Sequence, residues 1–338
     1  MIVPVRVTDA VGKRLAHDYT CIEPGYKGAV KRRGDLINHG DVEVLKNCGH
    51  YYVYIEVDNT ASGDYVHEVE AVKWLGEIIS GENVEVKLFE EGKANLHALA
   101  NGLLLVESSR LYKLNSSGLF VVVTLRNGSY VKRGDLIGVV DLIPLTVKKS
   151  SLDELQKRVV NGPLLRVVPS KKPKVALLVT GTEIVEGVRE DMCTPVVAMK
   201  LKQYDCELAD VDFARDDLKE IADKIVSFIK TYDAVVVTGG MSVDPTDYTP
   251  KSIELIASEI VAYGIPIKPT TMSMIAYIDN KPVIGVSSGI IKYPNENILD
   301  IVLPWISAGV KIPKDYVLSL GEGGLLRSFL EIRQEKAK

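Results

Sequence analysis

Two aspartates, Asp244 and Asp247, stand three residues apart in a loop that also contains two adjacent glycines. The loop follows an apolar run, 234–237, that is typical of a buried parallel strand. It leads into residues 251–261, whose apolar side chains recur at helical spacing. Carboxylates at a helix start could hold Mg²⁺, while backbone N–H groups there could bind a phosphate. Aspartates are equally common in plain turns and helix caps, so both interpretations stay open.

The residues around these aspartates favour an anion site at a helix N-terminus. Thr249 is a good N-cap, and Pro250 then falls at the first helical position, where its missing N–H costs nothing. Glycine lets the backbone approach a ligand closely. We therefore expect the loop to contact a ligand through Thr238, Gly239, Gly240, Met241 and Ser242.

Two other loops follow predicted strands of the same region. Thr180, Gly181, Thr182 and Glu183 come after the predicted strand 174–179, and Ser287, Ser288 and Gly289 come after the predicted strand 282–286. Since the carboxyl ends of parallel strands meet at one edge of a sheet, the three loops are expected to converge. Taken singly, each could be a plain strand-to-helix connection, and Glu183 could simply be solvated.

The elements that must position these loops alternate regularly after a proline-containing linker at 168–173. Strands are predicted at 174–179, 206–211, 233–237, 275–278 and 283–286, and helices at 195–203, 216–230 (capped by Asp216 or Asp217), 251–261 and 295–308. This order predicts the α/β class, with a doubly wound, mostly parallel sheet that binds ligands at its carboxyl edge.

The front half mixes strands and helices. We predict helices at 40–47, 65–80 and 92–104, and strands at 51–57 and 120–125. The motif Arg-Gly-Asp-Leu-Ile occurs at 33–37 and again at 133–137, which suggests two small β-barrel-like elements, although Gly-Asp turns are common. The expected domains are an N-terminal α+β domain (1–62), a middle helix plus β-barrel-like domain (63–168), the α/β domain (174–310) and a C-terminal tail (311–338).

Composition excludes several function classes. The 338 residues carry a net charge of −4, and residues 171–338 hold 20 Lys and Arg against 24 Asp and Glu. No half of the chain is therefore a basic nucleic-acid surface, and we expect no nucleic-acid partner. The N-terminus lacks the apolar core of a signal peptide, and no apolar run has membrane length. We expect a cytoplasmic protein with no membrane partner.

The cysteines and histidines show no metal-binding spacing. Cys21, Cys48, Cys193 and Cys206 are scattered without a Cys-x-x-Cys pair. We expect free thiols in a reducing compartment rather than a disulfide framework or a zinc site. All five histidines precede residue 98, so a histidine-based mechanism in the later domain is excluded.

Together the three loops resemble the molybdopterin-binding domain shared by molybdenum cofactor biosynthesis proteins. The resemblance is carried by residues 178–184, by 237–243 with the two following aspartates, and by 286–289. Residues 180–184 and 239–243 look like the molybdotransferase (MoeA-type) branch, as do residues 10–18 and the two Gly-Asp turns. The loop length of 244–250 instead is similar to the adenylyltransferase (MogA-type) branch.

Two departures from the molybdotransferase branch weaken the case for molybdate insertion more than the case for pterin binding. The third loop of that branch usually reads Leu-Pro-Gly-Asn-Pro, whereas this chain has Val-Ser-Ser-Gly-Ile at 286–290. That branch also has a final β-rich domain, whereas only residues 311–338 follow the α/β domain here.

The resemblance implies that molybdopterin or its adenylate binds across the three loops, with Asp244 and Asp247 as catalytic residues that place Mg²⁺ and the phosphate. In a molybdotransferase, the adenylate is cleaved as molybdate enters the dithiolene. In an adenylyltransferase, Asp247 would help position phosphate and metal for AMP transfer from ATP. A non-catalytic cofactor carrier or sensor, and a pyrophosphatase related to the competence-damage family, remain as alternatives. The resemblance also implies a homodimer, or a trimer for the isolated domain type.

Overall fold

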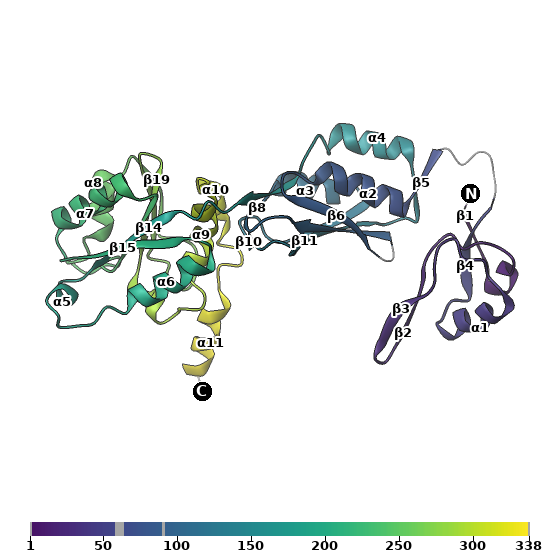
Figure 1. Cartoon of the computed structure of the whole chain (residues 1–338), viewed down its shortest axis with the longest axis horizontal. Helices are drawn as coiled ribbons and strands as arrows, with labels where there is room; N and C mark the ends of the chain where they lie inside the picture. Colours follow the sequence, from purple (N-terminus) through teal and green to yellow (C-terminus); the bar gives the residue numbers. More distant parts are fainter. Residues whose placement is uncertain (1, 58–63, 90–91, 337–338) are drawn as a thin grey trace. The chain divides into compact units, whose positions relative to one another are not determined.

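The computed structural model describes residues 2–57, 64–89 and 92–336 of the chain (Figure 1). Contacts divide the chain into two compact units. The first unit comprises residues 1–100, 104–127 and 132–167, and the second comprises 101–103, 128–131 and 168–338. Among the described residues, no helix is both long and apolar enough to cross a membrane.

The front part of the first unit, residues 2–57, is mostly β. Antiparallel pairs join β1 (Ile2–Arg6) to β4 (Tyr52–Glu56) and β2 (Tyr19–Glu23) to β3 (Tyr26–Lys31). The 3₁₀ helix η1 (Val7–Ala10) follows β1, and α1 (His39–Asn47) begins with a capping box between Asn38 and Asp41. Alternate residues of β4, Val53 and Ile55, enter a small core. The helix predicted at 40–47 and the strand predicted at 51–57 are confirmed, but the expected α+β mixture is mostly strands.

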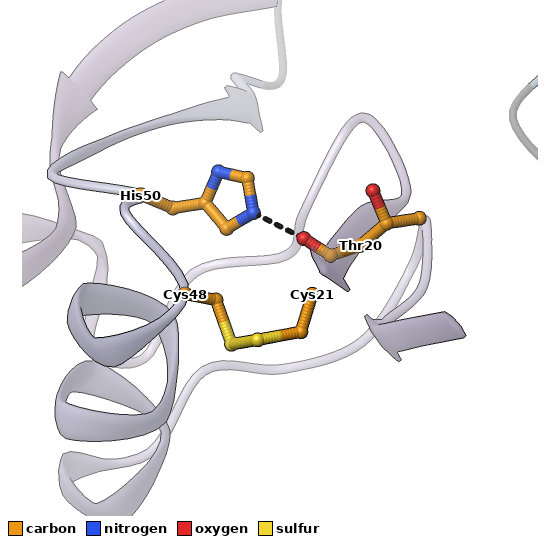
Figure 2. The surroundings of a disulfide bond; sticks show 4 residues. All are labelled: Thr20, Cys21, Cys48 and His50. Carbon is orange, nitrogen blue, oxygen red and sulfur yellow. Dashed lines mark hydrogen bonds between the residues drawn. A yellow bond between two sulfur atoms is a disulfide. The ribbon is translucent and has the colours of Figure 1, made fainter. Parts of the chain in front are cut away.

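Cys21 and Cys48 form a disulfide that joins β2 to the residue after α1, 27 positions along the chain (Figure 2). Beside it, His50 Nε2 lies 2.7 Å from the carbonyl oxygen of Thr20. The prediction of free thiols is wrong for this pair, because the fold places β2 beside the end of α1 and so brings together two cysteines that no spacing motif links. Cys193 and Cys206 are free, as predicted, and both are buried.

The middle part of the first unit is a helix packed on a four-stranded antiparallel sheet. The sheet has the order β6 (Val84–Phe89), β7 (Lys93–Ala98), β11 (Leu136–Leu142), β9 (Phe120–Thr124), and α2 (Glu68–Ile79) packs on three of these strands. The remaining elements between residues 64 and 169 are β5 (Tyr65–His67), β8 (Gly102–Val106), α3 (Ser108–Asn115), β10 (Tyr130–Val131), β12 (Thr146–Lys148), α4 (Lys149–Arg158) and β13 (Leu165–Pro169). Of these, β10 belongs to the second unit, and β8 and β13 contain residues of both units. The helix predicted at 92–104 is wrong. Every second residue of 93–98 is buried, which is the two-residue period of a strand.

The two Gly-Asp turns share one geometry. In each turn the aspartate side chain accepts a hydrogen bond from the N–H three residues earlier, at 2.9 Å in turn 32–35 and 2.8 Å in turn 132–135. In each, the glycine N–H donates to, and the aspartate carbonyl accepts from, a single residue of another segment: Leu15 for the first turn and Ala98 for the second. The repeated motif is therefore a repeated local design, while the barrel-like elements expected around it are not confirmed.

The second unit is built on a six-stranded sheet of the order β15-β14-β16-β19-β18-β17. The strands are β14 (Lys174–Thr180), β15 (Glu207–Ala214), β16 (Ala234–Thr238), β17 (Glu259–Tyr263), β18 (Met274–Ile278) and β19 (Lys281–Val286). The first four strands in the sheet order are parallel, and β18 and β17 are antiparallel to their neighbours. Residues 175–179 and 234–238 are buried throughout, as expected for inner parallel strands. The mixed α/β class is thus confirmed.

Helices of the second unit are α5 (Thr182–Val185), α6 (Cys193–Gln203), α7 (Leu218–Thr231), α8 (Thr249–Ile256), α9 (Ile298–Ala308), α10 (Lys314–Ser319) and α11 (Arg327–Lys336), with the 3₁₀ helix η4 (Ser288–Ile291). Helices α7 and α8 pack together and share a core with alternate residues of β14 and β16. The predicted helix 251–261 ends early, because Ala257 takes an extended conformation and Ile260 pairs with β18. The predicted tail 311–338 contains helices, and Leu325 pairs with Lys268.

Candidate functional site

A cavity of about 340 Å³ opens in the second unit where β14, β16 and β19 end. Each of the three predicted loops contributes to its lining. The lining includes Thr180, Gly181 and Glu183 from the first loop, Gly239, Gly240 and Asp247 from the second, and Ser288 from the third. The loops therefore meet at one edge of the sheet, as the parallel topology requires.

Glycines allow the first and second loops to touch. Gly239 has φ +96°, and a Cβ on it would lie 2.3 Å from the carbonyl oxygen of Thr180. Gly240 has φ +53°, and a Cβ there would lie 3.1 Å from Thr249 Oγ1. Residues with side chains rarely adopt such backbone angles, and at Gly239 there is no space for one. This wall of the cavity is consequently made of backbone.

Buried threonines connect the same two loops. Thr180 Oγ1 donates to the carbonyl of Thr238 at 3.1 Å and lies 3.2 Å from Thr249 Oγ1. The prediction that Thr249 is the N-cap of α8 is therefore wrong. The N-cap is Tyr248, and it makes no capping bond with its side chain. The hydroxyl of Thr249 faces Thr180 instead. No side chain therefore caps the N–H groups in the first turn of α8.

The two predicted aspartates play different parts. Asp247 Oδ2 accepts hydrogen bonds from the N–H groups of Ser242 (2.8 Å) and Asp244 (3.1 Å), so this carboxylate holds the loop in shape. Asp247 is also half-buried in the cavity lining. Asp244 is exposed and lies outside the lining. Of the two aspartates, only Asp247 both holds the turn through hydrogen bonds and lines the cavity.

The other predicted contact residues lie beside the cavity rather than in its lining: Thr182, Thr238, Met241, Ser242, Ser287 and Gly289. Met241 is buried against Gly285, where a Cβ would lie 2.8 Å from the methionine sulfur. Its carbonyl accepts a hydrogen bond from the hydroxyl of Tyr263 at 3.1 Å. Met241 therefore packs against β19 in the core and anchors the loop, rather than facing a ligand.

Asp216 lines the cavity, although the sequence suggested a helix cap. Its Oδ2 accepts from both the N–H (2.8 Å) and the hydroxyl (3.0 Å) of Thr182, which ties the loop after β15 to the loop after β14. The cap of α7 is Asp217, which accepts from the N–H of Glu220 at 2.8 Å. The only sequence signal was the position of Asp216 just after a strand of the sheet.

Sequence reasoning also missed Arg189, Glu190 and Cys193 in the lining. Arg189 brings a guanidinium to a lining that otherwise carries the carboxylates of Glu183, Glu190, Asp216 and Asp247. Burial raises the pKa of the Cys193 thiol, so this group is neutral near pH 7 and is a poor nucleophile. No spacing pattern marked these three residues.

The lining carboxylates fit the expected magnesium only in part. The described residues contain no group of three or more His, Cys, Asp or Glu that could hold one metal ion. A metal cage made by protein side chains alone is therefore not found there. Mg²⁺ usually binds through one or two carboxylates, with phosphate oxygens and water completing its shell. Asp247 fits that arrangement, whereas the exposed Asp244 does not line the same cavity.

Solved structures similar to this chain include two MoaB proteins. The molybdopterin biosynthesis enzyme MoaB from Thermus thermophilus has 17% sequence identity and a TM-score of 0.36, and the match covers 42% of this chain and 98% of that chain. The tungsten cofactor synthesizing protein MoaB from Pyrococcus furiosus has 21% identity and a TM-score of 0.34, with coverage of 40% and 93%.

Curated relatives include two molybdopterin molybdenumtransferases. That of Staphylococcus epidermidis is 26% identical over 129 residues, which is 36% of this chain and 31% of the relative. That of Staphylococcus aureus is 27% identical over 124 residues, with coverage of 35% and 30%. The chain thus spans less than a third of the length of these relatives.

Family models match two separate stretches of the chain. Residues 4–57 match a domain of unknown function (DUF8806). Residues 176–306 match a probable molybdopterin binding domain, and this stretch contains all three cavity loops. The resemblance predicted from those loops is confirmed: the α/β part of this chain is similar to the molybdopterin-binding domain found in molybdenum cofactor biosynthesis proteins.

Proposed function

We propose that the cavity at the ends of β14, β16 and β19 binds molybdopterin or its adenylate for a step of molybdenum cofactor biosynthesis. The observation that carries this proposal is the convergence of the three loops on one cavity inside the matched residues 176–306. Its volume of about 340 Å³ lies in the range of small-molecule sites.

The phosphate of the ligand is expected beside Gly239 and Gly240, near the start of α8. The two glycines have no side chain, so a ligand can come close to their backbone, and no side chain caps the helix. Four carboxylates and one guanidinium line the cavity, so an anionic ligand would be repelled unless a cation came with it. Mg²⁺ held between Asp247 and the phosphate would supply that positive charge. This charge balance supports magnesium-dependent binding.

If the activity is molybdotransferase-like, the chain acts mainly by positioning. The glycine wall and Asp247 would hold the adenylate while water attacks its phosphoanhydride bond to give AMP and the pterin phosphate, and the two thiols bind molybdate with the loss of one oxygen as water. Asp216, through its two bonds to Thr182, would keep the first loop in register with the other two. We also propose, from the resemblance alone, a cytoplasmic homodimer.

A second candidate function is a non-catalytic cofactor carrier or sensor. It is favoured by one observation: Asp244 is exposed and outside the cavity lining, so the predicted pair of catalytic carboxylates is not assembled there. A carrier needs the cavity but not the second carboxylate.

The test is to incubate the purified protein with molybdopterin adenylate, Mg²⁺ and molybdate, and to measure binding and AMP release. AMP release supports the transferase, and binding without AMP supports the carrier. Asp247→Asn is expected to weaken Mg²⁺-dependent binding at least tenfold, because it removes the charge but keeps a hydrogen-bond acceptor. Asp35→Asn is the matched control, since Asp35 also accepts a backbone N–H in a turn. Wild-type affinity in Asp247→Asn would refute the assignment.

A further inference from the structure

We propose that Arg189 anchors the phosphate of the ligand and so makes the cavity select phosphorylated pterins over dephosphorylated ones. This inference rests on the proposed function and adds a specificity-determining residue to it. Neither the family match nor the loop motifs assign a role to Arg189.

The backbone of Arg189 is fixed beside the cavity. After α5 the chain turns at Gly187, which has φ +73°. The N–H groups of Val188 and Arg189 then both donate to the carbonyl of Glu183, at 2.8 and 3.0 Å. Glu183 itself lines the cavity, and its carboxylate folds back over Gly181, where a Cβ would lie 3.1 Å from Oε2. Arg189 therefore starts from a position set by the first loop.

The guanidinium of Arg189 is available for a ligand. Among the ion pairs of the described residues, none within 4.0 Å involves Arg189, although Glu183 and Glu190 line the same cavity. A guanidinium presents N–H donors in a planar fork that matches two phosphate oxygens at once. An unpaired fork beside a cavity is what a bidentate phosphate contact needs.

Charge makes this contact decisive for the choice of ligand. The lining carries four carboxylates, and Arg189 is its one basic side chain among the described residues. The nearby Lys251 and Lys292 lie over the rings of Tyr248 and Tyr293, at 5.7 and 5.6 Å, and neither is part of the lining. Without Arg189, no side chain of the lining would favour a phosphate dianion over a neutral hydroxyl by its own charge, and the preference would depend on Mg²⁺ and on backbone N–H groups.

The experiment compares two probes, a stable oxidised derivative of molybdopterin and the same compound after removal of its phosphate. Binding of each is measured by fluorescence titration in Mg²⁺. The wild-type protein is expected to bind the phosphorylated probe at least tenfold more tightly. In Arg189→Gln that preference should fall at least about threefold, with the dephosphorylated probe bound as in the wild type, while Mg²⁺ at Asp247 and the start of α8 keep the remainder. Arg189→Lys should restore part of the preference, because the charge returns without the fork.

The matched control is Arg215→Gln, which removes the same charge from an exposed residue next to Asp216 but outside the lining. This variant should keep the wild-type preference. Equal weakening of both probes in Arg189→Gln, or equal preferences in the two glutamine variants, would overturn the assignment of Arg189 while leaving the proposed function intact. Failure of the wild-type protein to bind either probe would instead overturn the proposed function.

Discussion

The front domain (residues 2–57) and the α/β part of the second unit are held together in different ways. In the front domain a core of nine buried residues is supplemented by the Cys21–Cys48 disulfide. In the α/β part, inner strands buried on both faces form the core, and the two cysteines, Cys193 and Cys206, are free. A small domain buries too little apolar surface to be very stable, so a covalent link matters more there. The cavity belongs to the part that needs no such link.

Buried charge shows the same contrast. In the α/β part, Lys200 is 1% exposed and donates to Asp300 at 2.6 Å, and the Tyr204 hydroxyl donates to the same oxygen at 2.7 Å. This network joins α6 to α9 inside the unit. In the front domain the comparable pair is Lys31–Asp41 at 2.7 Å, in which Asp41 is buried and Lys31 is partly exposed. The ion pair of the α/β part is thus more deeply buried than that of the front domain, which has the disulfide in addition.

The strongest way to test this comparison is to remove the disulfide. Replacing Cys21 and Cys48 by serine removes a cross-link between residues 27 positions apart, so the unfolded chain gains conformational entropy. This should destabilise the front domain by about 3–4 kcal/mol. The α/β part should not change. Hydrogen exchange followed by mass spectrometry, on peptides from 2–57 and from 174–308, measures both regions in one sample.

A dithiol reductant should reproduce this effect in the wild-type protein and have none on the double serine variant, which serves as the control. Equal loss of protection in both regions, or no loss in the front domain, would contradict the comparison.

Substitution of glycines measures how tightly the cavity wall is packed. Gly239→Ala places a Cβ 2.3 Å from the Thr180 carbonyl at a positive φ, and should cost about 2–4 kcal/mol and abolish ligand binding. Gly264 in the same unit has φ +80°, and an added Cβ there would meet no atom within 4 Å, so Gly264→Ala should cost only about 1 kcal/mol. Urea unfolding and pterin titration check both variants. Similar costs would mean that the contact between the two loops can relax.

The α/β part could be predicted from sequence because its signals are local. Buried parallel strands appear as continuous apolar runs, as in 175–179, and each cavity loop directly follows such a run. By contrast, part of the helix predicted at 92–104 is the strand 93–98, although alanine and leucine, which favour helices, occupy its buried positions Ala94, Leu96 and Ala98. Residues 93–98 form a strand because they pair with β6 and β11 on either side, and this pairing outweighs the local preference for a helix.

Two missed features, Asp216 in the cavity and the Cys21–Cys48 disulfide, depend on pairs of residues far apart in sequence. Asp216 is a cavity residue because Thr182, 34 positions earlier, holds its carboxylate. Cys21 in β2 is bonded to Cys48 at the end of α1, 27 positions later. The difference between Asp244 and Asp247 depends on which carboxylate turns toward the loop N–H groups, and the shared residue type cannot show this.

The smallest expected effect is the pH dependence of two ion pairs, Asp41–Lys31 in the front domain and Asp212–Lys224 in the α/β part. Burial alone would raise the pKa of Asp41, but the hydrogen bond and charge of Lys31 and the N–H of Asn38 outweigh it and lower this pKa below its usual 3.8. A carboxyl whose pKa is lowered by folding stabilises the protein above the unfolded value and loses that contribution as pH falls through the folded value. The front domain should therefore weaken below about pH 4.

Asp41→Asn should remove that acid-dependent step from the front domain, by less than about 1 kcal/mol because the ion pair is partly exposed. Asp212 is the matched control, since Lys224 at 2.6 Å also lowers the pKa of its carboxyl against the effect of burial, but on edge strand β15 of the other unit. Asp212→Asn should move the acid response of the α/β peptides only. If either variant changes both regions in pH-dependent hydrogen exchange, the two parts unfold as one, and the contrast between a cross-linked domain and a self-sufficient sheet fails.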